Sequence, residues 1–207
     1  MGFFDYFRRR QPIRDSRALA DFIDRNAAFL IQKAIYEYSR ARAGHYSKVL
    51  FKEPSFHKAV EQSRWRAFPL GLAMVAEAAE GILRTHSGGD ARREFDALVE
   101  IVLSVFDRYP VPEALSKEDW QALRADLERR LRFINLHPVK RALDIPEPYA
   151  TLYFDLMPIH EKLRGRDFET TKNYLRVTMT HVHDELTNRL DAPATAKSLI
   201  SGLVAAN

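Results

Sequence analysis

The sequence predicts an all-α protein, an irregular bundle of about six to eight helices, and three observations carry that prediction. Apolar residues recur every three or four positions over most of the chain, which is the spacing of one buried face of an α-helix. No segment alternates polar and apolar residues like a half-buried strand. The composition, 46% hydrophobic and 29% charged, is ordinary for a globular protein, and 207 residues suffice for one domain with a sizeable core.

The first two helices are predicted from their end signals and their apolar content. The first runs from about Asp15 to Gly44, because an aspartate can cap the first turn and a glycine can adopt the left-handed conformation that ends a helix. The second follows Pro54, with Ser55 as its N-cap, and an internal proline kinks or restarts it. Residues 70–79 are almost wholly apolar, so we expect them at the centre of the core.

The later helices are placed in the same way. Asp90 and Ser116 are predicted to cap the next two helices, and Asp167 is predicted to cap the long last one. These signals divide the chain into a basic–aromatic N-terminal arm (residues 1–14), a single all-helical domain (residues 15–192) and a C-terminal tail or short docking helix (residues 193–207).

Positive charge is concentrated in two segments, although the net charge of the whole chain is only +4. Residues 1–14 carry four arginines and one aspartate, and residues 40–66 carry seven lysines or arginines against two glutamates. Cations interleaved with aromatic rings suit phosphates or an anionic lipid surface. We predict that the second segment binds its partner through Arg40, Arg42, His45, Tyr46, Lys48, Arg64, Trp65 and Arg66.

Helix geometry limits how many of these cations can share one face. Arg40 and Arg42 are two residues apart, so on a regular helix they point in roughly opposite directions, and Arg64 and Arg66 do the same. We expect a patch of about three cations, which suits a weak and salt-sensitive contact. The aromatic and arginine residues of the N-terminal arm have the composition of a second contact, an interfacial membrane anchor.

The alternative function is a hydrolase, either esterase-like or metal-dependent, with its active site in the helical bundle. His181 and Glu185 are one helical turn apart and could share a metal with His160 or Glu161. Ser55 and Lys58 match the Ser-x-x-Lys pattern of one class of esterases. Paired Glu-x-x-His motifs of a di-iron bundle are absent, and we expect neither a metal nor a cofactor.

Two runs of residues carry a resemblance to a known family. The opening MGFFDYFRRR and the run YEYSRARAGHY, from Tyr36 to Tyr46, resemble a family of uncharacterised bacterial all-helical proteins, some of which are described as esterases. The resemblance covers most of the chain and implies an all-helical fold, but it transfers no catalytic residue. The Gly-x-Ser-x-Gly turn of an α/β-hydrolase is absent from the sequence.

Several classes of function are excluded or disfavoured. The chain has no cysteine, which excludes disulfides and thiolate chemistry and fits a reducing cytoplasm. No helix-turn-helix, zinc-finger or RNP signature is present, so we do not expect specific nucleic-acid recognition. We therefore expect a cytoplasmic, non-enzymatic helical protein that binds an anionic ligand, an inner-membrane surface or a protein partner through residues 1–14 and 40–66.

Overall fold

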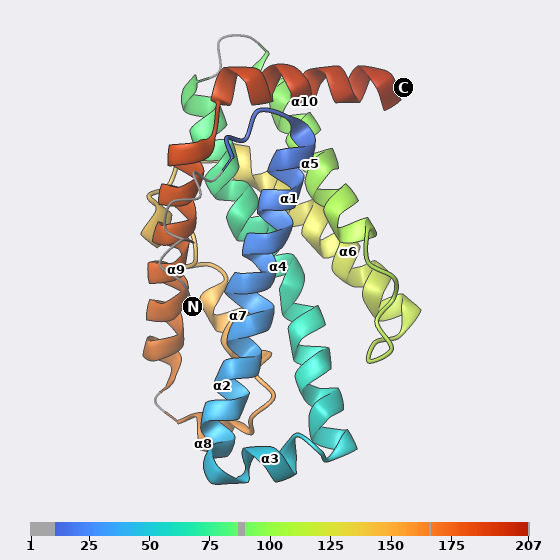
Figure 1. Ribbon diagram of the computed structural model, residues 1–207, viewed down its shortest axis with the longest axis vertical. Coiled ribbons are helices and arrows are strands. Elements are labelled where there is room, and N and C mark those ends of the chain that lie inside the picture. The colour runs from blue at the N-terminus through green and yellow to red at the C-terminus, as the bar shows by residue number, and fades with distance from the viewer. Residues whose placement is uncertain (1–10, 87–89, 166, 207) are drawn as a thin grey trace.

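The computed structural model describes residues 11–86, 90–165 and 167–206, and their regular structure is helical, so the predicted all-α fold is confirmed (Figure 1). A π-helical segment (Ala28–Lys33) joins the first two helices into one rod. The helices are α1 (Ser16–Ala27), α2 (Ala34–Ala43), α3 (Ser47–Leu50), α4 (Pro54–His86), α5 (Ala91–Asp107), α6 (Lys117–Phe133), α7 (Ala150–Asp155), α8 (Glu161–Arg164), α9 (Asp167–Arg189) and α10 (Ala192–Ala206).

Most of the residues predicted to begin or end a helix are found at helix termini. The Asp15 carboxylate accepts a hydrogen bond of 2.7 Å from the backbone N–H of Ala18 at the start of α1. Gly44 ends the rod with a positive φ of 52°. Asp90 and Ser116 cap α5 and α6 through side-chain acceptors, as predicted.

The start of α4 differs from the prediction. Ser55 lies inside the first turn of the helix and is not its N-cap, because Pro54 already occupies the first helical position. Proline suits that position, since it lacks an N–H group that the helix would leave without a partner. The helix then continues through Pro69 as one element of 33 residues.

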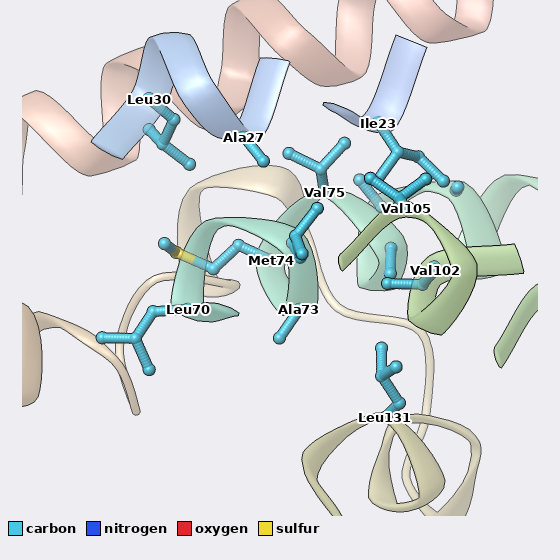
Figure 2. Close-up of a cluster of buried hydrophobic side chains, with 14 of the residues drawn as sticks. Ile23, Ala27, Leu30, Leu70, Ala73, Met74, Val75, Val102, Val105 and Leu131 are labelled. Carbon is cyan, nitrogen blue, oxygen red and sulfur yellow. The ribbon is translucent and has the colours of Figure 1, made fainter. Parts of the chain in front are cut away.

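The C-terminal part of α4 forms the centre of the core. Each residue from 67 to 83 is buried, including the predicted central run 70–79. Figure 2 shows how side chains of α1, α5 and α6, among them Ile23, Val102 and Leu131, surround this helix. None of the described helices is long and apolar enough to cross a membrane.

A close contact between α4 and the rod depends on a glycine. A Cβ atom at Gly71 would lie 2.6 Å from Cγ1 of Ile31 and 3.0 Å from the backbone oxygen of Ala27. These atoms lie at the junction of α1 and the π-helical segment. The two helices therefore pack at a distance that only a residue without a side chain allows.

The segment before α1 is tied to the other end of the chain. The backbone N–H of Ile13 donates to the oxygen of Arg189, and the Ile13 oxygen accepts from Asp191 N–H at 2.9 Å and from the Thr195 hydroxyl at 3.1 Å. The predicted C-terminal tail is the helix α10, which lies across one end of the bundle and buries Leu199 (Figure 1). Residues 1–10 of the predicted arm lie outside the described residues.

Candidate functional site

The basic segment lies at the end of the bundle farthest from α10, where α2 ends, α3 crosses and α4 begins (Figure 1). Its shape is held by a chain of aromatic contacts. The ring of Phe51 lies edge-on against Tyr36 at 5.1 Å and against Phe56 at 5.2 Å. These contacts fix α3 between the two longer helices, so the residues on α3 have defined positions.

Three of the five predicted patch cations are held in ion pairs. Arg64 contacts Glu61 at 2.5 Å, and Arg66 contacts Asp119 at 3.1 Å. Arg42 forms an ion pair with Asp167, and its Nε donates to Oδ2 at 2.6 Å. The five cations therefore do not form one unpaired face, and the predicted patch is corrected to a smaller one.

The pairing of Arg42 changes the role expected for Asp167. Asp167 is the first residue of α9, and its carboxylate accepts hydrogen bonds from Arg42 and from the Tyr38 hydroxyl, the latter at 2.8 Å. The hydrogen bond from Arg42 holds the pKa of Asp167 below its ordinary value. Asp167, which was predicted to be the N-cap of this helix, is instead its first helical residue, and its carboxylate joins α2 to α9.

Trp65 is partly buried and contributes to the packing of the core. It packs against the core, with its ring edge-on to Phe68, Tyr109 and Trp120 at 5.3–6.0 Å. Aromatic pairs of this kind stabilise a fold beyond the area they bury. This packing leaves only part of the Trp65 side chain accessible to a partner.

The remaining predicted residues, Arg40, His45, Tyr46 and Lys48, are exposed at the end of the bundle. Tyr46 is 73% exposed, and Val49 beside it is 59% exposed. From residue 40 to residue 58 five cations face one acidic residue. We call this surface, formed by residues 40–58, the basic end.

Another exposed apolar side chain lies close to the basic end. Leu163 on the short helix α8 is 69% exposed. The carbonyl oxygen of Arg164 accepts a hydrogen bond of 3.4 Å from Arg42, so α8 lies against the end of α2. Lys162 is also exposed on this helix. The basic end and α8 together present apolar side chains among cations.

The structure brings together two of the five predicted catalytic candidates. His181 and Glu185 line a cavity of about 710 Å³ between α1 and α9, together with Arg25 and Arg189. Glu185 accepts from Arg189 at 2.5 Å and lies 3.6 Å from Arg25. A carboxylate held by two arginines is a poor base for an adjacent histidine.

The other candidates lie elsewhere. His160 is exposed before α8, where its Nδ1 accepts from the backbone N–H of Lys162 at 3.3 Å. Ser55 and Lys58 are exposed in the first turns of α4. Among the residues the structure describes, no group of three or more His, Cys, Asp or Glu side chains could hold a metal ion.

The sequence analysis missed a third location, a cavity lined by Tyr38 and Tyr153 between α2, α7 and α9. Tyrosine is an ordinary core residue, so no local signal marked either position. Tyr38 and Arg42 are four residues apart, and that spacing could have shown that both face one neighbour.

No protein-family model, no curated protein sequence and no solved structure matches this chain.

Proposed function

We propose that this protein binds peripherally to anionic membrane surfaces through its basic end, as a cytoplasmic protein that lies against the inner membrane. The observation that supports this most is the exposure of Tyr46 and Val49 on α3 among lysines. Amphipathic rings and short aliphatic side chains enter the headgroup region, while lysines contact lipid phosphates.

The charge available predicts a weak and reversible contact. Arg40, Lys48, Lys52 and Lys58 are exposed, and no described residue forms an ion pair with any of them. Each cation near an anionic bilayer contributes about 1 kcal/mol, so four contribute about 4 kcal/mol. An energy of about 4 kcal/mol corresponds to a dissociation constant on the order of 1 mM. Stable attachment would need a second contact, and the arginines of the N-terminal arm have the right charge.

A lipid surface fits the basic end better than a nucleic acid does. Base stacking requires several exposed aromatic rings, whereas Phe51 and Phe56 contact one another within the turn. Val49 and Leu163 offer nothing to a phosphate backbone, but both suit the apolar boundary of a bilayer. The competing occupant is a protein partner with an acidic apolar surface, and a protein that does not bind anionic vesicles would favour it.

The alternative function, a hydrolase, has weaker support from the structure than membrane binding has. Its best candidate pair, His181 and Glu185, lines one cavity, but the Glu185 carboxylate is occupied by Arg189 and Arg25. A hydrolase would need that carboxylate to orient the histidine.

Co-sedimentation with vesicles tests the proposal. The whole protein should bind vesicles of phosphatidylcholine with about one quarter phosphatidylglycerol, and binding should fall steeply above about 0.5 M salt, where the screening length is a few Å. The double variant Lys48→Ala, Lys52→Ala should bind about 30-fold more weakly, since two cations contribute about 2 kcal/mol.

A matched control removes the same charge elsewhere. Arg92→Ala with Lys117→Ala takes two exposed cations from α5 and α6, and should change vesicle binding less than about threefold. Val49→Asp should weaken binding at constant salt. Equal binding to neutral phosphatidylcholine vesicles, or equal losses in the two double variants, would contradict the proposal. Deletion of residues 1–10 reports separately on the N-terminal arm.

A further inference from the structure

A pocket of about 330 Å³ lies between α4, the last turn of α6 and the segment 137–149 that leads to α7. Its volume is at the lower end of the range of small-molecule sites. The lining combines charged side chains with an apolar wall formed by Phe133, Ile134 and Pro148. None of the lining residues belongs to the basic end.

The end of α6 supplies two arginines to the pocket. Arg129 and Arg130 share the single carboxylate of Asp126, and Nε of Arg130 donates to it at 2.6 Å. One carboxylate offsets only one of the two guanidinium charges. The Arg130 guanidinium also lies over the ring of Tyr149, 5.9 Å from the ring centre. The two arginines therefore leave one positive charge beside this tyrosine.

The segment after α6 supplies a lysine and is held against α4. Nζ of Lys140 lies 2.8 Å from the buried Oε1 of Glu77, and Nε2 of His137 lies 3.5 Å from the same oxygen. Arg84 of α4 donates to the backbone oxygens of His137 at 2.8 Å and of Ile134 at 3.4 Å. Glu77 thus offsets the charge of Lys140, and Arg84 occupies carbonyl oxygens that would otherwise repel an anion. These bonds fix the walls before a ligand enters, which reduces the ordering that binding requires.

Tyr149 contributes a neutral hydrogen-bond donor. The residue is only 6% exposed, and its hydroxyl has no hydrogen-bond partner among the described residues. The hydroxyl oxygen is not fully enclosed, so its accessible surface opens on the pocket that Tyr149 lines. Burial raises the pKa of Tyr149, and the nearby charge of Glu77 raises it further. The hydroxyl therefore stays protonated beside the charged groups of the pocket and is able to donate to a ligand oxygen.

The charge of the pocket and its apolar wall decide the class of ligand. With His137 neutral, three cations stand against two carboxylates, which leaves a net charge of +1. That charge attracts an anion and suits a carboxylate better than a doubly charged phosphate. Phe133, which is 59% exposed, offers its ring to an apolar group.

We propose that this pocket binds a small aromatic carboxylate, with its carboxylate group beside Arg130 and the Tyr149 hydroxyl and its ring against Phe133. The site does not rest on membrane binding, and no lipid is needed to test it.

The test follows para-fluorobenzoate, which is ionised at neutral pH, by fluorine NMR in vesicle-free buffer. The whole protein should bind it saturably, with a dissociation constant on the order of 1 mM or lower. The amide para-fluorobenzamide has nearly the same shape without the charge and should bind at least about tenfold more weakly, the loss of a charge-assisted contact. Benzoate should displace the probe, whereas acetate at the same concentration should not, because it lacks the ring.

Two variants identify the site. Tyr149→Phe removes the donor but keeps the ring, and should raise the dissociation constant about tenfold. Phe133→Ala removes an exposed ring, so it should weaken binding several-fold while the helical circular dichroism is kept. The matched controls are Tyr109→Phe, which removes a hydroxyl that donates to Asp24 outside the pocket, and Tyr46→Ala, which removes an exposed ring from the basic end. Both controls should leave the affinity unchanged.

Three outcomes would overturn the assignment. They are the absence of saturable binding, an equal affinity for the fluorobenzamide, and binding that neither Tyr149→Phe nor Phe133→Ala weakens. Displacement by acetate as effective as that by benzoate would show a site for bare anions, and the aromatic class of ligand would then be wrong.

Discussion

The two halves of α4 differ sharply in burial, although they form one continuous helix. Residues 67–83 are buried without exception, and the rod, α5, α6 and α9 pack around them. Residues 54–66, which the structure describes throughout, bury Val60 and Ser63 and leave the others partly or fully exposed. One half is the centre of the core and the other half supports the basic end, so stability and the proposed binding are separated along a single helix.

The forces that hold the two halves also differ. The buried half is fixed by close packing, with a glycine at the closest approach. The exposed half is fixed by ion pairs and by edge-to-face aromatic contacts. Close packing contributes several kcal/mol per residue, whereas exposed ion pairs contribute less than about 1 kcal/mol each. Substitutions in the two halves should therefore have very unequal effects on unfolding.

The largest effect is expected at Gly71. Gly71→Leu should lower the free energy of unfolding by about 3 kcal/mol or more, because the new side chain meets the backbone oxygen of Ala27, which cannot move aside. Urea denaturation followed by circular dichroism measures the change. Gly202→Leu on α10 is the control, since nothing lies within 4 Å of its Cβ position, and it should change stability by less than about 1 kcal/mol. Similar losses in both would mean that the helix crossing is not tight.

The second-largest effect is expected at an ion pair of the buried half of α4, which we compare with an ion pair of the exposed half. In the buried half, Glu80 is 7% exposed and accepts from Arg84 through both oxygens, at 2.6 and 2.7 Å. In the exposed half, Arg66 and Asp119 are about half exposed. Glu80→Gln should cost about 2 kcal/mol, because it leaves a poorly solvated guanidinium without its carboxylate, and Asp119→Asn should cost less than about 0.5 kcal/mol.

Double-mutant cycles complete that comparison. Each carboxylate variant is combined with its arginine changed to methionine, Arg84→Met or Arg66→Met, and the coupling energy is taken from urea unfolding. A coupling of the Arg66 pair as large as that of the Arg84 pair would show that burial does not divide the two halves of the helix.

Much of the fold was predictable because its signals are local. The caps at Asp15, Asp90 and Ser116 and the apolar run 70–79 are each encoded by a few neighbouring residues. Ser55 was misplaced for a local reason too, since two adjacent residues both suit a helix start and Pro54 takes the first helical position.

The candidate site was less predictable because its partners are distant in sequence. Arg42 is paired with a residue 125 positions away and Arg66 with one 53 positions away, so charge counting overestimated the patch. No sequence signal marks the Tyr153 hydroxyl, because it is the tertiary packing that leaves it without a hydrogen-bond partner among the described residues. Charge density in a sequence thus shows where cations lie, and the tertiary structure shows which of them remain available.

The smallest expected effect concerns Asp167, which ties α2 to α9 near the basic end. Arg42 lowers the pKa of Asp167 from its ordinary value of 3.8, so the ionised form is favoured in the folded state. A lowered carboxyl pKa stabilises the fold fully above the unfolded value, and this stabilisation is lost as the pH falls through the folded value. Asp167→Asn should therefore be less stable than the parent protein at about pH 7, and the difference should shrink below about pH 4.

Urea midpoints at several pH values measure this difference, and Tyr38→Phe is the matched variant. That substitution removes one hydrogen bond to Asp167 but keeps the ion pair with Arg42, so its stability should retain most of the pH dependence of the parent protein. If the loss in Asp167→Asn were the same at both ends of the pH range, the residue would act through packing. Ion pairs would then contribute less to the stability of this exposed end than their number indicates. The difference between it and the buried half of α4, which is held by close packing, would be smaller.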